Sequence, residues 1–180
     1  REHVSRFMKK QGRKIACVIV EPVAGNMGVV PPQPGFLQAL RKETSRYGAL
    51  LIFDEVITGF GRLGEWFGAD FVGVTPDIMS FAKGITSGYF PVGGSISTQK
   101  IADAFAGGPE KAWSHMYTYS AHPGGAAAAF ANLEIVEREN LVENARIRGE
   151  QISESLLDMK DQNVIIGDVR GVGLIQGIEF

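Results

Sequence analysis

The 180-residue sequence predicts an α/β fold built on a mixed sheet. Short, continuous apolar runs occur at 15–21, 50–54 and 77–82, as expected of strands buried on both faces. Segments with apolar residues at helical spacing lie between and after these runs. Glycines and prolines separate the two kinds of segment, as they do at turns.

The first strand, IACVIVE at 15–21, ends on Glu21, and a loop rich in Gly and Pro follows it. The next segment, PGFLQALRKETSRYG, is predicted to be a helix, because Pro34 suits a helix start and Gly48 a helix stop. Its apolar residues fall at helical spacing: Phe36, Leu37, Leu40 and Tyr47.

The second and third strands are LLIFD at 50–54 and DIMSFA at 77–82, and Lys83 directly follows the third. A fourth strand-like run occupies 92–98, only about eight residues beyond Lys83, whereas a parallel crossover needs a dozen or more. We therefore expect this strand to run antiparallel to the third, which makes the sheet mixed.

The C-terminal part is predicted to contain a helix at 123–137 and an amphipathic helix of about five turns after Asn140. Asn140 and Glu143 resemble a capping pair at the start of that second helix. The final run, from 163 to 180, returns to strand and turn, and we expect a domain boundary near residue 140. The chain opens mid-pattern and closes on a strand-like run with nothing after it as a sheet partner, which suggests a segment of a longer protein.

The composition excludes several classes of function. A formal net charge of −2 gives no electrostatic basis for binding nucleic acid or an anionic membrane. No apolar run approaches the roughly 20 residues of a membrane-spanning helix. The single cysteine, Cys17, cannot form an internal disulfide, so we expect a reducing compartment, the cytoplasm. The three histidines lack the close spacing of a metal site, and none is predicted.

Three ionisable residues, Glu21, Asp54 and Lys83, lie at predicted carboxyl ends of strands, where ligands gather in α/β sheets. An Asp–Lys ion pair, or an Asp that caps a loop, would be a purely structural explanation. Lys83 fits such an explanation less well, because it follows an apolar stretch and lysine is rarely buried without a partner. Gly84 would leave room for a cofactor beside it.

A desolvated lysine has more of the neutral amine that attacks a carbonyl carbon to form an imine. An imine-forming lysine opposite a carboxylate suits pyridoxal phosphate, with the lysine on the aldehyde and the carboxylate on the pyridine nitrogen. A pyridinium would also supply the cation that a buried Asp54 requires.

Several motifs resemble class III pyridoxal-phosphate aminotransferases, most closely the omega-amino acid or amine:pyruvate branch. They are IFDEVITGFGRLGEWFG, TPDIMSFAKGITSGYFPVGG and YTYSAHP, and the similarity covers almost the whole chain. The resemblance implies fold type I, with a mixed, mostly parallel sheet in a large domain. Residues 1–139 would be part of that domain, and 140–180 the start of a smaller C-terminal α/β domain. It also implies a homodimer with a shared active site.

By resemblance, each motif residue takes a role. Lys83 in FAKG would be the Schiff-base lysine and proton shuttle, and Asp54 in FDEV would pair with the pyridine nitrogen. Val56 would pack on the ring, although it could be an ordinary core residue. Thr118 in TYS would bind the phosphate of the neighbouring subunit's cofactor, although it could be a helix-entry hydroxyl. Glu21 would lie near the substrate, although it could simply end its strand.

The sequence departs from the family pattern in two ways. Met116 stands where related sequences usually have glycine, which could alter the loop near the neighbouring cofactor. The phosphate-binding Gly-Ser/Thr loop, the ring-stacking aromatic and the later substrate-binding arginine are absent from these 180 residues.

The implied activity is transfer of an amino group from an amine or omega-amino acid to a keto acid such as pyruvate. An aminomutase or decarboxylase would share the first steps. A non-catalytic protein of this fold would not require lysine at position 83. A nicotinamide-dependent dehydrogenase is a remote alternative, because GFGRLG at 59–64 matches G-x-G-x-x-G. That fingerprint needs a strand directly before it and a helix directly after it.

Overall fold

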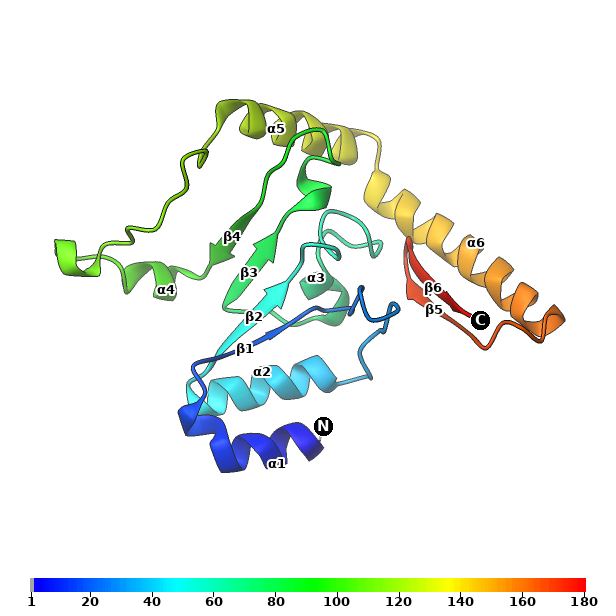
Figure 1. Ribbon diagram of the computed structural model, residues 1–180, viewed down its shortest axis with the longest axis horizontal. Helices are drawn as coiled ribbons and strands as arrows, with labels where there is room; N and C mark the ends of the chain where they lie inside the picture. The colour runs from blue at the N-terminus through cyan, green and yellow to red at the C-terminus, as the bar shows by residue number, and fades with distance from the viewer. Residues whose placement is uncertain (1) are drawn as a thin grey trace.

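The computed structural model describes residues 2–180, and its larger sheet has four strands in the order β1-β2-β3-β4 (Figure 1). Their bounds are Cys17–Val20, Leu50–Asp54, Ile78–Phe81 and Gly94–Ser97. β1, β2 and β3 run parallel, whereas β4 runs antiparallel to β3. The predicted mixed sheet is confirmed, including the direction of the strand after Lys83.

Helices connect these strands and cover part of the sheet. The α-helices are α1 Glu2–Gln11, α2 Phe36–Tyr47, α3 Gly68–Val72, α4 Gln99–Asp103, α5 Pro123–Arg138 and α6 Leu141–Gln162. Short 3-10 turns lie at η1 Gly12–Lys14, η2 Lys83–Ile85 and η3 Pro109–Lys111. The predicted helix after Pro34 is confirmed as α2, and the predicted helix at 123–137 is confirmed as α5. Among residues 2–180, no helix combines the length and the apolarity needed to cross a bilayer.

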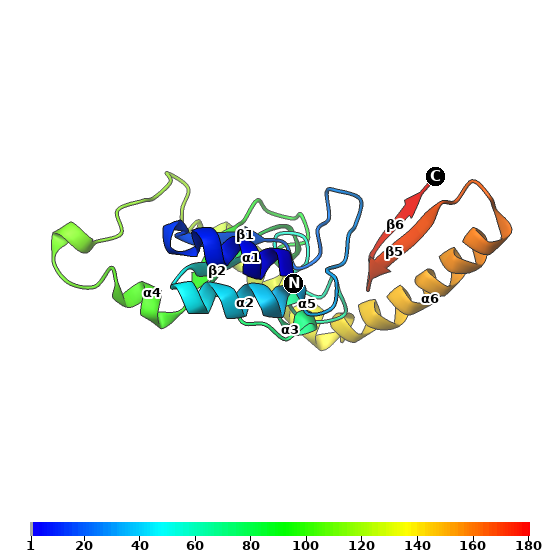
Figure 2. The same ribbon diagram turned by 90° about the horizontal axis from the view of Figure 1, so that it is seen from below.

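One face of the sheet forms the hydrophobic core. Leu51 and Phe53 of β2 are fully buried and pack with Leu37 and Leu40 of α2 and with Val74. Figures 1 and 2 show α1 and α2 side by side along this part of the sheet. Since side chains alternate along a strand, Leu51 and Phe53 point to this core and their neighbours point to the other face.

The other face of the sheet is partly open in this chain. Ile19 of β1 is paired with Ile52 and is 63% exposed, and Cys17 is exposed as well. The prediction that the strand at 15–21 is buried on both faces is therefore wrong for this face. Asp54 shares the open face with Ile52, because the two residues are separated by two positions in β2.

A second sheet lies at the C-terminal end. β5 Asp168–Val172 and β6 Ile175–Glu179 form an antiparallel hairpin beside α6 (Figure 2). The strand-and-turn prediction for this end is confirmed. The closing strand does have a partner, but that partner precedes it in the sequence.

The predicted capping pair at the start of α6 is wrong. Asn140 does lie at the N-cap, but its side chain makes no capping hydrogen bond. Its backbone is left-handed, with φ +51°, because the chain turns sharply between α5 and α6. Glu143 instead pairs with Arg146 at 2.6 Å along the helix. The predicted domain boundary falls at this turn, and the division of the chain into domains stays a prediction.

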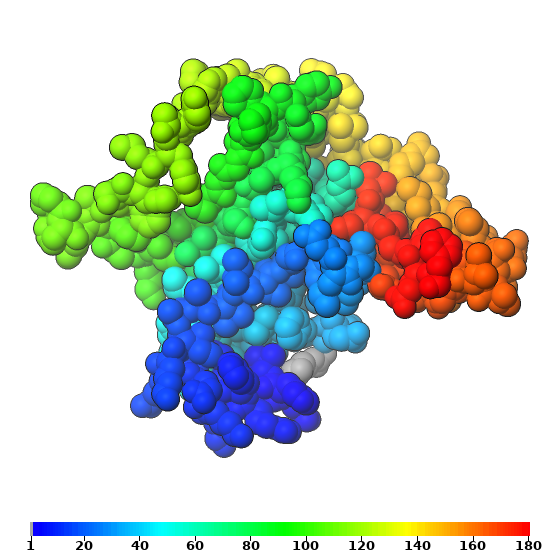
Figure 3. All heavy atoms as spheres, in the orientation of Figure 1, coloured from blue at the N-terminus to red at the C-terminus, as the bar shows by residue number. Residues whose placement is uncertain are grey.

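The segment between α4 and α5, residues 104–122, extends away from the sheet, and we call it the arm. Figure 3 shows the arm at the left, with an opening between it and the strands. Its residues are exposed over most of its length, and Thr118 lies near its C-terminal end.

Candidate active site

Parallel pairing brings the three predicted ionisable residues to one edge of the sheet. Glu21 directly follows the last residue of β1, and Asp54 is the last residue of β2. Asp54 pairs with Ser80 of β3, and Lys83 begins η2 three residues later. The expected gathering at the carboxyl ends of the strands is therefore confirmed.

Asp54 uses only one of its carboxylate oxygens. Oδ1 accepts hydrogen bonds from the backbone N–H of Val56 at 3.1 Å and from the hydroxyl of Ser80 at 3.2 Å. Oδ2 accepts none from residues 2–180, and within that range no ion pair joins Asp54 to Lys83. The ion-pair interpretation is wrong, and the loop-capping interpretation accounts for only half of the carboxylate.

Lys83 is exposed in this chain, so the prediction that its amine is buried is not met here. Its side chain forms no hydrogen bond or ion pair with residues 2–180. Its backbone has φ +42°, a left-handed conformation that is uncommon for residues other than glycine.

Gly84 packs closely against the loop that follows β2, and its role in leaving room for a cofactor stays a prediction. A Cβ at this position would lie 3.1 Å from Cβ of Phe60 and 3.2 Å from the carbonyl oxygen of Gly59. The turn that carries Lys83 therefore rests directly on the loop that follows β2.

Val56 and Glu21 lie beside this edge. Val56 is half-buried in the turn after β2, where its N–H binds Asp54. Glu21 is half-buried, and its Oε2 accepts a hydrogen bond from the N–H of Gly25 at 3.0 Å. Glu21 also lines a groove between the end of β1 and the loop that contains Met27. The position of Glu21 near the substrate stays a prediction.

Thr118 is not the hydroxyl that caps α5. His122 is the N-cap, and its Nδ1 accepts a hydrogen bond from the N–H of Gly124 at 3.1 Å. Thr118 lies in an exposed turn closed by hydrogen bonds between Tyr117 and Ser120. The helix-entry interpretation of Thr118 is therefore wrong.

Glu55, next to Asp54, is fully buried and holds the loop after β2. Its carboxylate accepts hydrogen bonds from the N–H groups of Gly68 and Ala69, at 2.8 and 2.7 Å, and from the hydroxyl of Thr58. Burial raises the pKa of Glu55, although these hydrogen bonds act in the opposite direction. Its place is structural: it ties β2 to the start of α3.

Three residues near this edge receive no role from the sequence alone. Ser80 binds Asp54, Glu55 organises the adjoining loop, and Asn132 of α5 binds the turn of Lys83. The pairing register would have identified Ser80, since it lies directly opposite Asp54. No sequence signal distinguishes Asn132 from other helical asparagines.

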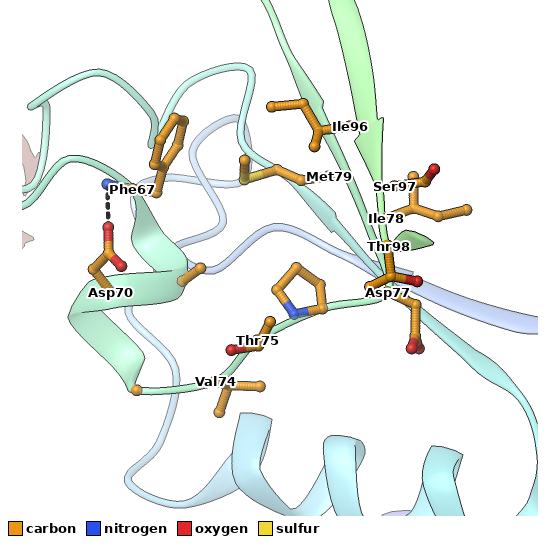
Figure 4. Close-up of a pocket in the computed structure, with 13 residues that line it drawn as sticks. Phe67, Asp70, Val74, Thr75, Asp77, Ile78, Met79, Ile96, Ser97 and Thr98 are labelled. Carbon is orange, nitrogen blue, oxygen red and sulfur yellow. Dashed lines mark hydrogen bonds between the residues drawn. The ribbon is translucent and has the colours of Figure 1, made fainter. Parts of the chain in front are cut away.

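A hollow of about 400 Å³ lies elsewhere, between α3 and the β3–β4 pair (Figure 4). Val74, Met79 and Ile96 give it an apolar lining, and the carboxylate of Asp70 accepts a hydrogen bond from the N–H of Phe67. It opens beside Asp77 and Thr98, near the amino end of β3, and so lies away from Lys83.

The described residues fit the chemistry of pyridoxal phosphate. Within residues 2–180, Oδ2 of Asp54 has no donor and so could accept from a protonated ring nitrogen, and the amine of Lys83 has no competing partner. Both groups lie at the same edge of the sheet: Asp54 ends β2, and Lys83 follows the end of the adjacent β3.

The alternative based on GFGRLG is wrong. Residues 56–64 form successive turns rather than a strand-to-helix junction. The first helix afterwards, α3, has five residues and begins at Gly68. The glycines therefore lack the helix N-terminus on which a dinucleotide fingerprint depends.

Comparisons with known proteins agree on one family. The family model described as aminotransferase class-III matches residues 1–180. The beta-alanine–pyruvate aminotransferase of Pseudomonas aeruginosa is 45% identical over 170 residues, which are 92% of this chain and 38% of the relative. The alanine/serine racemase of Pyrococcus horikoshii is 42% identical over 167 residues, covering 93% of this chain and 34% of the racemase.

A solved structure gives the same result. The amine transaminase from an uncultivated Pseudomonas species, described as the PLP-bound (internal aldimine) form, has a TM-score of 0.91 and 43% identity. The match covers 96% of this chain and 39% of that structure. The chain thus spans less than two fifths of the length of these relatives. It belongs to the class-III aminotransferase family, in its omega-amino acid and amine:pyruvate branch.

Proposed function

We propose that the full-length protein is a pyridoxal-phosphate-dependent aminotransferase that moves an amino group from an amine or omega-amino acid to a keto acid such as pyruvate. A single observation carries this proposal: at one edge of the sheet, neither Oδ2 of Asp54 nor the amine of Lys83 has a partner among residues 2–180. When bound, pyridoxal phosphate supplies an aldehyde that bonds to amines and a ring that accepts electrons from the substrate carbon.

Four residues of this chain would have separate roles in the reaction. Lys83 would bond to the aldehyde as the Schiff-base lysine and then, once released, carry a proton to and from the substrate carbon. Asp54 would keep the ring nitrogen protonated through its free Oδ2, while Val56 and Ser80 fix its Oδ1. Val56 would pack against the ring, and Glu21 would lie on the substrate side.

The protein would act as a homodimer in which each subunit completes the other's site. Thr118 lies exposed on the arm. Such a hydroxyl is accessible to a phosphate held by a neighbouring subunit. The beta-alanine–pyruvate relative supports an omega-amino acid as donor and pyruvate as acceptor.

The test of the lysine uses Lys83→Ala in the full-length protein, with Lys42→Ala as the matched control on the exposed side of α2. We expect Lys83→Ala to lose the visible absorbance of the lysine-bound cofactor and at least 10³-fold in transamination. Lys42→Ala should keep both. Borohydride reduction followed by peptide mass analysis should locate the cofactor on Lys83. Wild-type turnover in Lys83→Ala would refute the assignment.

Racemisation is the second candidate, because a racemase matches this chain about as well as the aminotransferases do. A panel of amines, omega-amino acids and alanine, each with pyruvate or 2-oxoglutarate, separates the two. An aminotransferase forms a new amino acid in proportion to the keto acid consumed. A racemase inverts alanine with no keto acid present and no net change in amine.

A further inference from the structure

The turn that carries Lys83 is held by a side chain from a distant helix. Nδ2 of Asn132, in α5, donates hydrogen bonds to the carbonyl oxygens of Gly84 at 2.9 Å and Ile85 at 3.1 Å. Figure 1 shows α5 beside the segment that follows β3. One primary amide has two N–H groups, so a single side chain satisfies both carbonyls.

This turn has a backbone that would not hold its shape unaided. Lys83 has φ +42° and Ser87 has φ +48°, and both are residues with side chains. Left-handed backbone at such residues persists only where the surroundings fix it, and it gathers at functional sites. Ser87 lies two residues beyond the end of η2, so left-handed backbone occurs both at the start of this turn and just after it.

Other residues contact the two sides of the turn, but among residues 2–180 only Asn132 binds the carbonyl oxygens of Gly84 and Ile85. Gly84 rests on Phe60 and Gly59 from below. Thr86 is almost fully buried, and its hydroxyl donates to the carbonyl oxygen of Phe90 at 2.6 Å. The side chain of Lys83 has no partner among residues 2–180, so its direction depends on the backbone that Asn132 holds.

We propose that Asn132 is a positioning residue that locks the Lys83–Ile85 turn and thereby aims the Lys83 amine at the edge where Asp54 lies. This inference rests on the proposed function, since it assigns Asn132 to the orientation of the cofactor-binding lysine. Asn132 itself acts through the two carbonyls and does not touch the reacting atoms.

The experiment compares Asn132→Ser and Asn132→Gln in the full-length protein with Asn144→Ser. Serine is too short to bind both carbonyls, whereas glutamine keeps the amide and should restore part of the effect. Asn144 is a matched control because it is an exposed helical asparagine, in α6, with only a 3.3 Å contact from Arg148.

The first measurement is amide hydrogen exchange of peptides covering residues 82–90 in the cofactor-free protein. We expect exchange about tenfold faster in Asn132→Ser, an intermediate rate in Asn132→Gln and the wild-type rate in Asn144→Ser. Wild-type exchange in Asn132→Ser would overturn the proposal. A variant that no longer folds would show that the contact serves the fold, and would overturn it equally.

The second measurement is the pH midpoint of the visible absorbance band in the cofactor-loaded protein, together with kcat and KM. A mispositioned amine should shift that midpoint and lower kcat while KM stays near its wild-type value. Faster exchange with an unchanged midpoint and kcat would reduce Asn132 to a structural contact and overturn the proposal. Failure of the proposed function is distinguishable, because it appears as retained activity in Lys83→Ala, whereas exchange in the cofactor-free protein depends only on Asn132.

Discussion

Asp54, at the end of β2, and Lys83, just after the end of the adjacent β3, do not pair with each other within residues 2–180. A structural role would favour a direct contact, because an ion pair would offset part of the cost of keeping a carboxylate half-buried. Instead Asp54 is fixed through one oxygen by Val56 and Ser80, and the other oxygen is left free. A carboxylate oxygen that is partly buried without a hydrogen-bond partner is characteristic of functional sites.

Glu55 shows the opposite case, in which a carboxylate is fully satisfied and fully buried. It accepts hydrogen bonds from the N–H groups of Gly68 and Ala69 at the start of α3. It therefore anchors the loop against which the Lys83 turn packs. Burial is the largest cause of its raised pKa, because a low-dielectric surrounding disfavours the charged form.

We predict that Glu55→Gln lowers the stability of the full-length protein and changes its pH dependence. The amide replaces one acceptor oxygen with a donor that faces a donor, which costs about 1–3 kcal/mol. Because the folded pKa of Glu55 is raised above its ordinary value of 4.5, the stability from its protonated form is fully present below pH 4.5. That stability is lost as pH rises through the folded pKa, and glutamine should remove this dependence.

The measurement for Glu55→Gln is the melting temperature at a series of pH values from 4 upward. Glu65→Gln is the control, because Glu65 is exposed in the same loop. A pH profile of Glu55→Gln that follows the wild type would show that another group titrates in this range.

At the residue scale, the sequence predicts those parts of the site that depend on residue type and position along the chain. Asp54 and Lys83 are identifiable because an ionisable residue at the end of an apolar run is unusual. Ser80 and Asn132 are not, because their roles depend on which residues lie opposite them after folding. The sequence predicts a buried Lys83 side chain, whereas this side chain is exposed here. Its burial depends on which other segments cover it, and the residue pattern does not contain that information.

At the element scale, hydrophobic pattern and turn chemistry predict the strands and helices well. The short link between Lys83 and the next strand allowed only an antiparallel return, and β4 has that direction. The pattern could not predict how Asn140 would be used, because the same residue type serves as an N-cap and in left-handed turns. The sharp turn between α5 and α6 required the left-handed conformation.

The junction between α6 and the β5–β6 hairpin depends on a close approach of two backbones. A Cβ at Gly149 would overlap the carbonyl group of Gly173, in the turn of the hairpin. The same turn is joined to the loop after β2, because the N–H of Leu174 donates to the carbonyl oxygen of Arg62 at 2.9 Å. Gly149 therefore sets the position of the hairpin against the site-bearing part of the chain.

We predict that Gly149→Ala destabilises this junction by about 1–3 kcal/mol, as expected of overpacking. Alanine is the better helix former by about 1 kcal/mol, so an exposed glycine would give the opposite sign. Limited proteolysis between residues 163 and 175 should become faster, and the melting temperature should fall. Glu154→Ala, at an exposed position of α6, is the control. If the melting temperature of Gly149→Ala were above that of the wild type, the hairpin would not be in close contact with α6 at this position in the full-length protein.

At the scale of the whole molecule, the chain has an open sheet face and an exposed arm. Ile19 is 63% exposed on that face, and the arm carries Tyr117 and Tyr119, which are also exposed. The relatives are more than twice as long as this chain. The residue pattern of 180 residues does not predict what contacts these surfaces. Only the resemblance of its motif predicts that Thr118, on the arm, would bind the phosphate of a neighbouring subunit's cofactor.

Complementation between two inactive or weakened variants can test whether Thr118 binds the cofactor of the neighbouring subunit. We predict that Thr118→Ala in the full-length homodimer weakens cofactor retention about tenfold, because a hydrogen bond to a charged group contributes about 1.5–3 kcal/mol. The Lys83→Ala homodimer should be inactive. A mixed dimer of the two variants contains one site with Lys83 from one subunit and Thr118 from the other.

If Thr118 binds the neighbouring subunit's cofactor, that one site is complete, and the mixed dimer should retain cofactor as tightly as wild type with about half of its activity. If Thr118 acts within its own subunit, every site that keeps Lys83 lacks Thr118, and the mixed dimer retains the weak binding of Thr118→Ala. A dimer of Lys83→Ala with wild type sets the half-active reference. Cofactor release on dilution, measured by absorbance for these dimers, separates the two arrangements, and weak retention in the mixed dimer would contradict a shared active site.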